Sequence, residues 1–530
     1  MRYKWFGYLA AGLLALTSQL AIAAGLTAQG YDRHVELFWQ DLAKSNHEYQ
    51  LWVKIDGGDW QQRQSVSSDS VIDFTGDLGR NLALTYKLVD AATSKELGQV
   101  KVSTRDFSDD ELLDMVQRYT FRYFWDDADP KTGWAHERQP NMKDGNIITS
   151  GGTGFGIASV ITGAERGWIS REQAVDRMLK LTKSLATMER FHGMWGHWYN
   201  ADTGKIFHFS KYDDGGDTVE SAFMAQGLLT ARQYFNAGSK KEQQLRQEIT
   251  ALWEAMDWQW YTQGQDVMYW HWSKNYGFKM NHAIKGYNEA LIVYVLAASS
   301  PTHATSDQPY HKGWAGWDVP TFRNYQDYYG MALPLGNKEH KGGPLFFAHY
   351  SFMGLDPRGL RDRYANYWQQ NVRHTLINRA YVMDNPYAWK GYGEDFWGLT
   401  AGDNVPDGYT AHAPGFQRDH GTITPTAALS SMPYTPKESM QVLKNLYFNH
   451  GKELFGKMGF YDGINLSVSD DPQQQVRKTY LAIDQGPIVG MIENYRSGLL
   501  WNAFMRDPDI RKGLNKLGFS IKGQAIKPKQ

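Results

Sequence analysis

The sequence predicts a mainly α-helical toroid preceded by a small β domain, on three observations. Short alternating strand patterns fill residues 25–105, and helical periodicity begins at Ser108 and recurs to about residue 520. Long loops rich in Gly, Trp and Tyr separate the helical segments, as in a helical array whose polar and aromatic loops gather at one end. A chain of 530 residues is long enough for both domains.

The composition excludes several classes of function. A formal charge of −1 argues against nucleic acid or an anionic membrane surface as the main partner. The absence of cysteine excludes disulfides and thiol chemistry. The aromatic content is high, with 20 Trp, 31 Tyr and 24 Phe, and it favours a large core or a cleft whose rings stack on sugars.

The first residues have the pattern of an export signal. Arg2 and Lys4 precede an apolar run over Tyr8–Leu16, and Ala21-Ile22-Ala23 forms a small-x-small cleavage motif. We expect residues 1–23 to be a signal peptide, which places the mature chain in a bacterial periplasm or outside the cell. The alternative, a membrane anchor, needs about 20 apolar residues, more than this run supplies. We expect no membrane association after cleavage.

Residues 25–105 predict a small β-sandwich. Strand alternation runs over Val35–Trp39, Tyr49–Ile55 and Leu82–Leu88, and the turn Asp56–Asp59 suggests a hairpin. Short strands with frequent turns resemble a fibronectin type III domain. We expect a packing or spacer role, with glycan binding as the alternative.

Residues 108–520 predict the helical domain. Ser108 and Glu111 form a capping box that opens a helix through Phe124. The other predicted helices are Ser170–Glu189, Asp217–Phe235, Lys241–Trp258, Gly286–Ala298, Leu360–Asn378, Thr435–Phe448 and Pro487–Phe504.

Four acids gather between Asp213 and Glu220 at the predicted start of one helix. Asp217 is placed to cap the helix, and Glu220 lies three residues further on. The helix dipole favours the anionic form of Glu220, whereas burial favours the neutral acid that protonates a leaving group. A purely local capping box and a calcium loop are the alternatives.

Other polar and aromatic clusters also fall in predicted loops. One runs over Gly391–Asp403, another over Trp134–Arg138 with Asp144, and the glycine run Ser150–Gly156 follows it. That run lacks the Lys-Ser/Thr ending of a phosphate-binding loop. Further polar and aromatic residues are interpreted either as partners of sugar hydroxyl groups or as core residues whose hydrogen bonds are satisfied within the protein. They are Trp270-His271-Trp272, Asn281-His282 and Asn288-Glu289. No HExxH spacing occurs, so we expect no catalytic metal and no cofactor.

These clusters favour glycoside hydrolysis. No G-x-S-x-G motif is present for a serine hydrolase. Two remote carboxyl groups in an aromatic cleft suit a reaction in which one acid protonates the leaving oxygen and the other residue activates water or attacks carbon.

A series of motifs, in order along residues 108–520, resembles the bacterial glucoamylase-like domain and, within it, glycoside hydrolase family 144. The motifs are Leu112–Trp125, Gly151–Gly156, Asp213–Asp217 with Glu220, Leu296–His303, Phe346–Ser351, Leu429–Tyr434, Ala482–Pro487 and Glu493–Gly498. The resemblance implies an (α/α)6 barrel that cleaves β-1,2-glucans with inversion.

The resemblance also implies roles for individual residues. Glu220 is expected to be the general acid and Asp403 the base that activates water, with Glu394, Asp395, Asp144 and Asp484 as alternatives for the base. The expected substrate contacts are Trp125, Asp144, Asp217, Trp270, Trp272, His282, Tyr392, Glu394, Trp397 and Arg496.

The leading hypothesis is an exported, monomeric hydrolase of β-1,2-glucan or its oligosaccharides, with endo cleavage slightly preferred. Exo release of sophorose is the alternative within the family, and Asp307–Asn337 is a candidate wall that closes one end of the cleft. A polysaccharide lyase and a non-catalytic glycan-binding periplasmic protein are the alternatives outside it.

Overall fold

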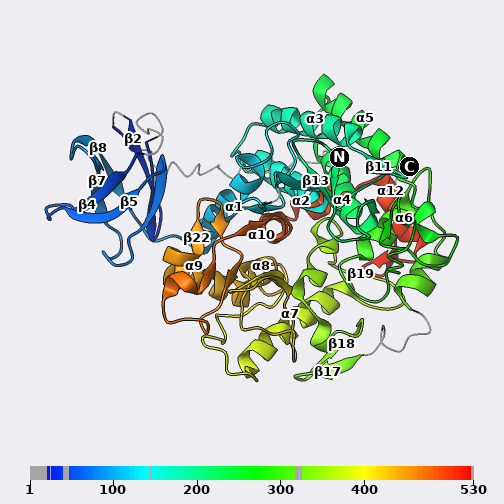
Figure 1. Ribbon diagram of the computed structural model, residues 1–530. Coiled ribbons are helices and arrows are strands. Elements are labelled where there is room, and N and C mark those ends of the chain that lie inside the picture. The colour runs from blue at the N-terminus through cyan, green and yellow to red at the C-terminus, as the bar shows by residue number, and fades with distance from the viewer. Residues whose placement is uncertain are drawn as a thin grey trace, which may run out of the picture. The chain divides into compact units, whose positions relative to one another are not determined.

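A computed structural model describes residues 21–23, 25–39, 47–143, 145–316, 322 and 325–526. The chain divides into two compact units, with the boundary between Asp110 and Glu111 (Figure 1). Most of the predicted signal peptide lies outside the described residues, and its last three residues, Ala21–Ala23, form strand β1. Among the described residues, no helix is both long enough and apolar enough to cross a bilayer.

The first unit contains two four-stranded antiparallel sheets. Their orders are β1-β2-β3-β6 and β5-β4-β7-β8. The bounds are β2 Leu26–Gly30, β3 His34–Phe38, β4 Tyr49–Ile55, β5 Gln61–Val66, β6 Ser70–Phe74, β7 Ala83–Asp90 and β8 Glu96–Ser103. Strand β4 has the predicted bounds, and it pairs with β5 as the predicted hairpin requires.

One buried cluster joins the two sheets of this unit. Leu37 of β3 and Leu51, Tyr86 and Val100 of the second sheet belong to it. Buried and half-buried residues alternate along β4, which is the pattern of a strand with one face on a core. The alternation along β4 in the sequence arises because one face of this strand packs on the shared core.

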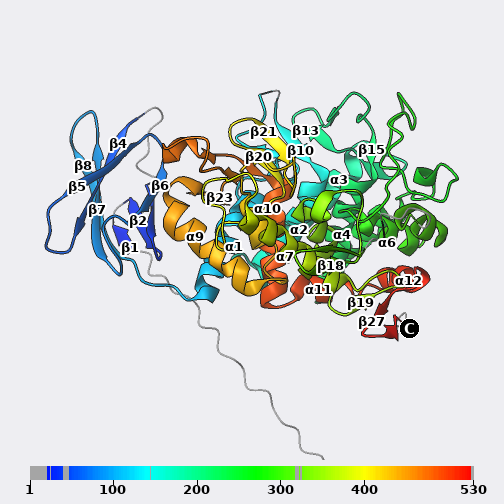
Figure 2. The same ribbon diagram turned by 90° about the horizontal axis from the view of Figure 1, so that it is seen from below.

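The second unit is built mainly from helices. Their bounds are α1 Asp109–Trp125, α2 Ser150–Glu165, α3 Arg171–Thr187, α4 Thr218–Tyr234, α5 Lys240–Glu254, α6 Leu291–Ser299, α7 Tyr367–Asp384, α8 Pro425–Leu429, α9 Pro436–Leu454, α10 Ala482–Arg496, α11 Leu499–Phe504 and α12 Pro508–Lys516. Five helices, α2, α4, α6, α8 and α10, are buried along most or all of their length. In contrast, α3, α5 and α9 bury one face only. Helix α2 packs against both α4 and α10 (Figures 1 and 2).

The helix predictions differ from the structure mostly at their ends. Helix α7 begins at Tyr367, because Leu360 and Arg361 form strand β19. The predicted helix over 487–504 is two helices, since Gly498 adopts a left-handed φ of 70° between α10 and α11. Helices α2, α8 and α12 were not predicted.

The sequence predicts a loop for the glycine run Gly151–Gly156, and this prediction is wrong. The run forms the first two turns of α2. Its glycines are needed for close packing. A Cβ on Gly154 would overlap the backbone of Phe223 in α4, and one on Gly152 would overlap Ala482 at the start of α10. The run therefore brings the first turns of three buried helices together.

Short strands and turns connect the helices. The strands are β9 Arg138–Gln139, β10 Ile147–Thr149, β11 Arg190–Phe191, β12 Met194–Trp195, β13 Trp198–Asn200, β14 Ile206–Phe207, β15 Gly216–Asp217, β16 His271–Trp272, β17 Gln326–Tyr328, β18 Met331–Leu333, β19 Leu360–Arg361, β20 Ala401–Asn404, β21 Gly408–Ala411, β22 Phe455–Gly456, β23 Gly459–Phe460, β24 Gly463–Ile464, β25 Val476–Arg477, β26 Tyr480–Leu481, β27 Ser520–Ile521 and β28 Gln524–Ala525. Pro309–Trp314 forms a π-helix, and 3₁₀ helices cover Trp260–Thr262, His340–Gly342, Leu345–Ala348, Ser351–Met353 and Pro472–Gln474.

Candidate active site

The start of α4 carries the first cluster of acids. Asp217 is the N-cap residue, and its Oδ1 accepts hydrogen bonds from the backbone N–H groups of Val219 at 2.8 Å and Glu220 at 2.9 Å. Strand β15, which contains Asp217, pairs with β16, so its position is set by the fold rather than by the helix alone.

Glu220 does more than the local capping that was the alternative interpretation. Its Oε2 accepts a hydrogen bond of 2.9 Å from the backbone N–H of Gly151, in the first turn of α2. The side chain is only 9% exposed. Burial raises the pKa of Glu220, while His197 and the Gly151 N–H act in the opposite direction. This environment suits an acid that holds its proton before reaction.

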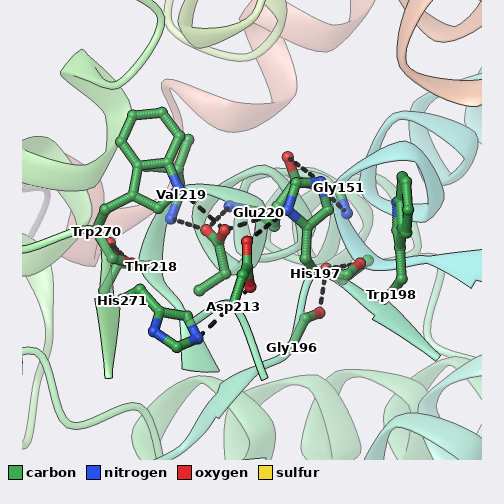
Figure 3. A network of polar contacts seen from close by, with 12 residues as sticks. Gly151, Gly196, His197, Trp198, Asp213, Thr218, Val219, Glu220, Trp270 and His271 are labelled. Atoms are coloured by element: carbon green, nitrogen blue, oxygen red, sulfur yellow. Dashed lines mark hydrogen bonds and ion pairs between the residues drawn. The ribbon is translucent and has the colours of Figure 1, made fainter. Parts of the chain in front are cut away.

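His197, in the loop before β13, lies among the acids of this cluster (Figure 3). Its Nδ1 lies 3.4 Å from Asp213 Oδ2 and 3.5 Å from Asp217 Oδ2, and its Nε2 lies 3.8 Å from Glu220 Oε1. Within the described residues, these atoms of His197, Asp213 and Asp217 lie within 4.8 Å of one another. Both nitrogens of the His197 ring therefore face carboxyl groups, and His197, Asp213 and Asp217 are close enough together to hold a metal ion.

Three predicted substrate contacts lie on the chain around β16. Trp270 donates from Nε1 to Asp217 Oδ2 at 2.9 Å, which orients the indole beside the acids. The ring of His282 lies 5.1 Å from that of Trp270, and His282 is exposed. Trp272 packs against Trp260 and His192 instead. The structure therefore places Trp270 next to Asp217 and His282 next to Trp270. Trp272 contacts Trp260 and His192 rather than the acids.

Asp403 lies in a second acidic cluster, on strand β20. It is fully buried, its two oxygens lie 3.3 and 3.1 Å from Arg138 Nη1, and its Oδ2 accepts a 2.6 Å hydrogen bond from Thr479. Asp462 accepts from the backbone N–H of Asp403. Burial, followed by the neighbouring charge of Asp403, raises the pKa of Asp462 to about 7.

Asp484, an alternative for the base, belongs to this cluster as well. It lies in the first turn of α10. Burial, followed by the neighbouring Asp462, raises the pKa of Asp484 well above its usual value. Tyr350 donates to Asp484 Oδ1 at 3.4 Å. A raised pKa favours the protonated form of Asp484, which counts against it as the base.

The neighbours Glu137 and Arg138 connect the two clusters. Glu137 Oε2 accepts a 3.1 Å hydrogen bond from Trp198 Nε1, beside His197, whereas Arg138 pairs with Asp403. Burial raises the pKa of Glu137 to about 7, against the charges of His197 and Arg138. Strand β9 then pairs with β26, which leads into α10. Both clusters consequently belong to one site at the first turns of α2, α4 and α10.

Tyr409 faces this site from the hairpin β20–β21. Tyr409 of β21 lies directly opposite Asp403 of β20 in the antiparallel pair, so the two side chains lie on the same face of the hairpin. Enclosure by surrounding protein and the charges of Asp484, Glu137, Asp462 and Glu220 raise the pKa of Tyr409 well above its usual value. Nevertheless its side chain is 52% exposed. Its ring is thus open to a ligand while lying among the acids of both clusters.

Several predicted contacts lie away from these clusters. Trp125 packs under Arg177 of α3, 4.3 Å from the guanidinium carbon to the ring centroid. Arg496, at the last turn of α10, binds Asp114 and Gln117 of α1. It lies 12 residues after Asp484, or about 18 Å along the helix. Arg496 therefore lies at the opposite end of α10 from Asp484, and its partners Asp114 and Gln117 are residues of α1.

The Gly391–Asp403 segment contributes less than its sequence suggested. Tyr392 donates to Asp419 at 2.8 Å, and Glu394 and Asp395 are exposed. Trp397 is fully buried and offers no surface to a ligand. Asp144 lies outside the described residues, as do parts of the candidate wall Asp307–Asn337.

Sequence reasoning missed His197, Asp462 and Tyr409. None of them lies in a run of acids or at a helical spacing from a predicted site residue. The adjacent Trp198 is the one signal for His197. Glu137 was part of a recognised cluster, but nothing local marked its role.

The chain is similar in sequence and in structure to known proteins. Residues 281–508 match the family model described as "Putative glucoamylase". An "Exo beta-1,2-glucooligosaccharide sophorohydrolase (non-reducing end)" from Parabacteroides distasonis is 40% identical over 513 residues, which covers 92% of this chain and 70% of that protein.

Two solved structures are also similar. A β-1,2-glucanase from Parabacteroides distasonis superposes with a TM-score of 0.83 at 39% identity, covering 94% of this chain and 74% of that one. An endo-β-1,2-glucanase from Chitinophaga pinensis, in complex with sophorotriose and glucose, superposes with a TM-score of 0.75 at 48% identity, covering 78% of this chain and 99% of that one.

Proposed function

Because the chain belongs to the glucoamylase-like family of glycoside hydrolases that includes these β-1,2-glucanases, we propose that it hydrolyses β-1,2-glucan and its oligosaccharides. One observation carries the proposal. Two separate carboxyl clusters, around Glu220 and Asp403, are joined by the neighbours Glu137 and Arg138 in a chain 40% identical to a sophorohydrolase. The alternatives of a lyase and of a binding protein are set aside, since the named relatives are hydrolases.

Glu220 is the proposed general acid. Its buried carboxyl keeps a proton that passes to the glycosidic oxygen as the bond to the anomeric carbon breaks. Asp403 is the proposed base, with Arg138 as a positive partner and Thr479 as a hydrogen-bond donor to its carboxylate. It takes a proton from the water that attacks the opposite face of the sugar. This inverting mechanism needs about 6.5–9.5 Å between the two carboxyl groups.

The finer features of the architecture are also proposals. Alternation of fully buried helices with helices buried on one face supports an (α/α)6 barrel. Two sheets on one core support a β-sandwich for residues 25–105. Export through the signal at residues 1–23, and a monomeric mature chain, complete the proposal.

Endo action is slightly preferred, and exo release of sophorose is the second candidate. The Chitinophaga pinensis relative is named as an endo enzyme, whereas the Parabacteroides distasonis relative that covers 92% of this chain is named as an exo enzyme. The endo relative has the higher identity to this chain, 48% against 40%, whereas the exo relative has the longer match.

Product chromatography distinguishes these possibilities. Purified protein beginning at residue 24 is incubated with linear β-1,2-glucan, and products are followed over time. Mixed oligosaccharides at early times support endo action, and sophorose alone from the start supports exo action. No product from the linear or the cyclic polymer overturns the proposed substrate.

A further inference from the structure

We propose that His197 is a positioning residue, held as an imidazolium, that serves as the shared counter-ion of Asp213, Asp217 and Glu220 and stabilises the Glu220 carboxylate after it has donated its proton. The inference deepens the proposed function and rests on Glu220 being the acid. It concerns a residue that does not contact the reacting bond.

The contacts use both ring nitrogens. Nδ1 faces Asp213 and Asp217 at 3.4 and 3.5 Å, and Nε2 faces Glu220 at 3.8 Å (Figure 3). A neutral imidazole has a hydrogen on one nitrogen only, so it would turn a lone pair toward a carboxylate on the other side. Once Glu220 has given up its proton, only the imidazolium matches carboxylate acceptors on both sides.

The ring is fixed in this orientation by its surroundings. It stacks on Phe209 with centroids 4.3 Å apart and planes 6° apart, and Trp198 meets it edge-on. The backbone carbonyl of His197 accepts a 3.1 Å hydrogen bond from the N–H of Ser150, the residue before Gly151. The same turn of α2 therefore anchors His197 and holds the carboxyl group of Glu220.

The charges around the ring favour its protonation. Burial by itself would lower the pKa of His197, but Glu220, Asp213 and Asp217 raise it to about 10. Glu137 is a further acid near the ring, and the positive charge of Arg138 partly offsets the negative charge of its carboxylate. His271 also faces Asp213, at 3.5 Å, but its Nε2 accepts a hydrogen bond from Gly215 N and burial lowers its pKa. His271 is therefore neutral and leaves His197 as the cation of this cluster.

The chemical consequence concerns the charge that forms during bond cleavage. When Glu220 passes its proton to the leaving oxygen, a buried carboxylate remains. A fixed positive charge nearby stabilises that carboxylate without any transfer of its own protons. His197 keeps both ring protons throughout, and Glu220 recovers its proton from solvent as the product leaves.

The first test reads the ring directly. Nitrogen-15 NMR of the histidine-labelled protein, with His197→Gln to assign the signal, should show two protonated ring nitrogens at pH 8. In Glu220→Gln the same ring should lose its proton at a lower pH than in the wild type. A neutral ring or a metal-bound nitrogen at pH 8 would overturn the proposal.

The second test uses the pH dependence of kcat/KM. Loss of a positive charge beside Glu220 raises the pKa of its carboxyl group and makes Glu220 a weaker acid. In His197→Gln the basic limb of the pH profile of kcat/KM should therefore move to higher pH by about one unit or more, and kcat should fall. His303→Gln is the matched control, since His303 also faces an acid, Asp257 at 3.6 Å, but its side chain is 41% exposed. A basic limb unchanged from the wild type in His197→Gln contradicts the proposal.

The two arms separate this inference from the proposed function. If Glu220→Gln retains wild-type turnover, the assignment of the acid fails, yet the NMR result still reports the charge of His197. If His197→Gln does not fold, the wild-type and Glu220→Gln spectra alone decide, because removal of one acid must lower the pH at which the imidazolium loses its proton.

Discussion

The backbone N–H of Gly151 donates a 2.9 Å hydrogen bond to Glu220 Oε2, and this bond joins the first turns of α2 and α4. It explains why a glycine occupies the second position of α2. A Cβ at residue 151 would overlap that same carboxylate oxygen. The position of the proposed acid thus depends on the absence of one methyl group.

Gly151→Ala should therefore lower kcat while leaving the protein folded. The overlapping atom is the end of a side chain, so Glu220 can move away, but displacement of about 1 Å costs about 100-fold in rate. Steady-state kinetics with circular dichroism checks this. Gly76→Ala is the control, because nothing lies within 4 Å of a Cβ there. Unchanged kcat in Gly151→Ala would show that the position of Glu220 is not critical.

Glu220→Gln should reduce turnover of β-1,2-glucan by about 10²–10⁴-fold, since an amide cannot protonate the leaving oxygen. The loss should be much smaller for a nitrophenyl sophoroside, whose leaving group departs without protonation. Comparison of the two substrates measures the acid role specifically. Equal losses on both substrates would indicate that Glu220 acts in some other way.

Asp403→Asn should abolish most turnover on both substrates, because water still needs a base whichever group leaves. Asp395→Asn is the matched control: Asp395 was an alternative for the base, but it is exposed. Rates are compared at saturating substrate, with thermal unfolding as a check. A near-wild-type rate for Asp403→Asn, with loss in Asp395→Asn, would reverse the assignment.

The sequence predicted the parts of the site that are contiguous. Asp213, Asp217 and Glu220 could be recognised because a helix start placed them together, and the family and the class of enzyme followed from motifs of this kind. The pairing of Arg138 with Asp403 joins residues 265 positions apart, so no local pattern reports it. His197 likewise gains its role only when α2 and α4 pack.

Other predictions depended on features that a sequence does not distinguish. An aromatic ring in a Gly-rich loop fits a sugar platform and a buried core equally well, and Trp397 is fully buried whereas Tyr409 is 52% exposed. The glycine run looked like a loop because glycine disfavours helices in isolation. Tight packing against Phe223 and Ala482 outweighs that preference.

Tyr409 should contribute to substrate binding through its exposed ring. Tyr409→Ala is expected to raise KM about tenfold, the loss expected for one aromatic contact of about 1.4 kcal/mol. Tyr409→Phe keeps the ring and should keep KM near the wild-type value. If both variants raise KM equally, the hydroxyl group and not the ring makes the contact, and if neither raises it, Tyr409 does not bind the substrate.

Asp462→Asn should change how stability depends on pH. The pKa of Asp462 in the folded protein is raised to about 7, chiefly by burial. Between pH 4 and 7 the folded state therefore keeps a proton that the unfolded state loses. Stability contributed by this group consequently falls as pH rises, by up to about 1.4 kcal/mol for each pH unit.

The asparagine variant cannot titrate at this position, and its side-chain oxygen can still accept from the Asp403 N–H. The free energy of unfolding of the wild type minus that of Asp462→Asn should thus decrease from pH 4 to pH 7 and level off above that. Urea unfolding at several pH values measures the difference. Glu137→Gln should behave alike, since burial raises the pKa of Glu137 to about 7 as well. A difference that rises with pH would mean that Asp462 is ionised in the folded protein, with Asp484 alone keeping the proton.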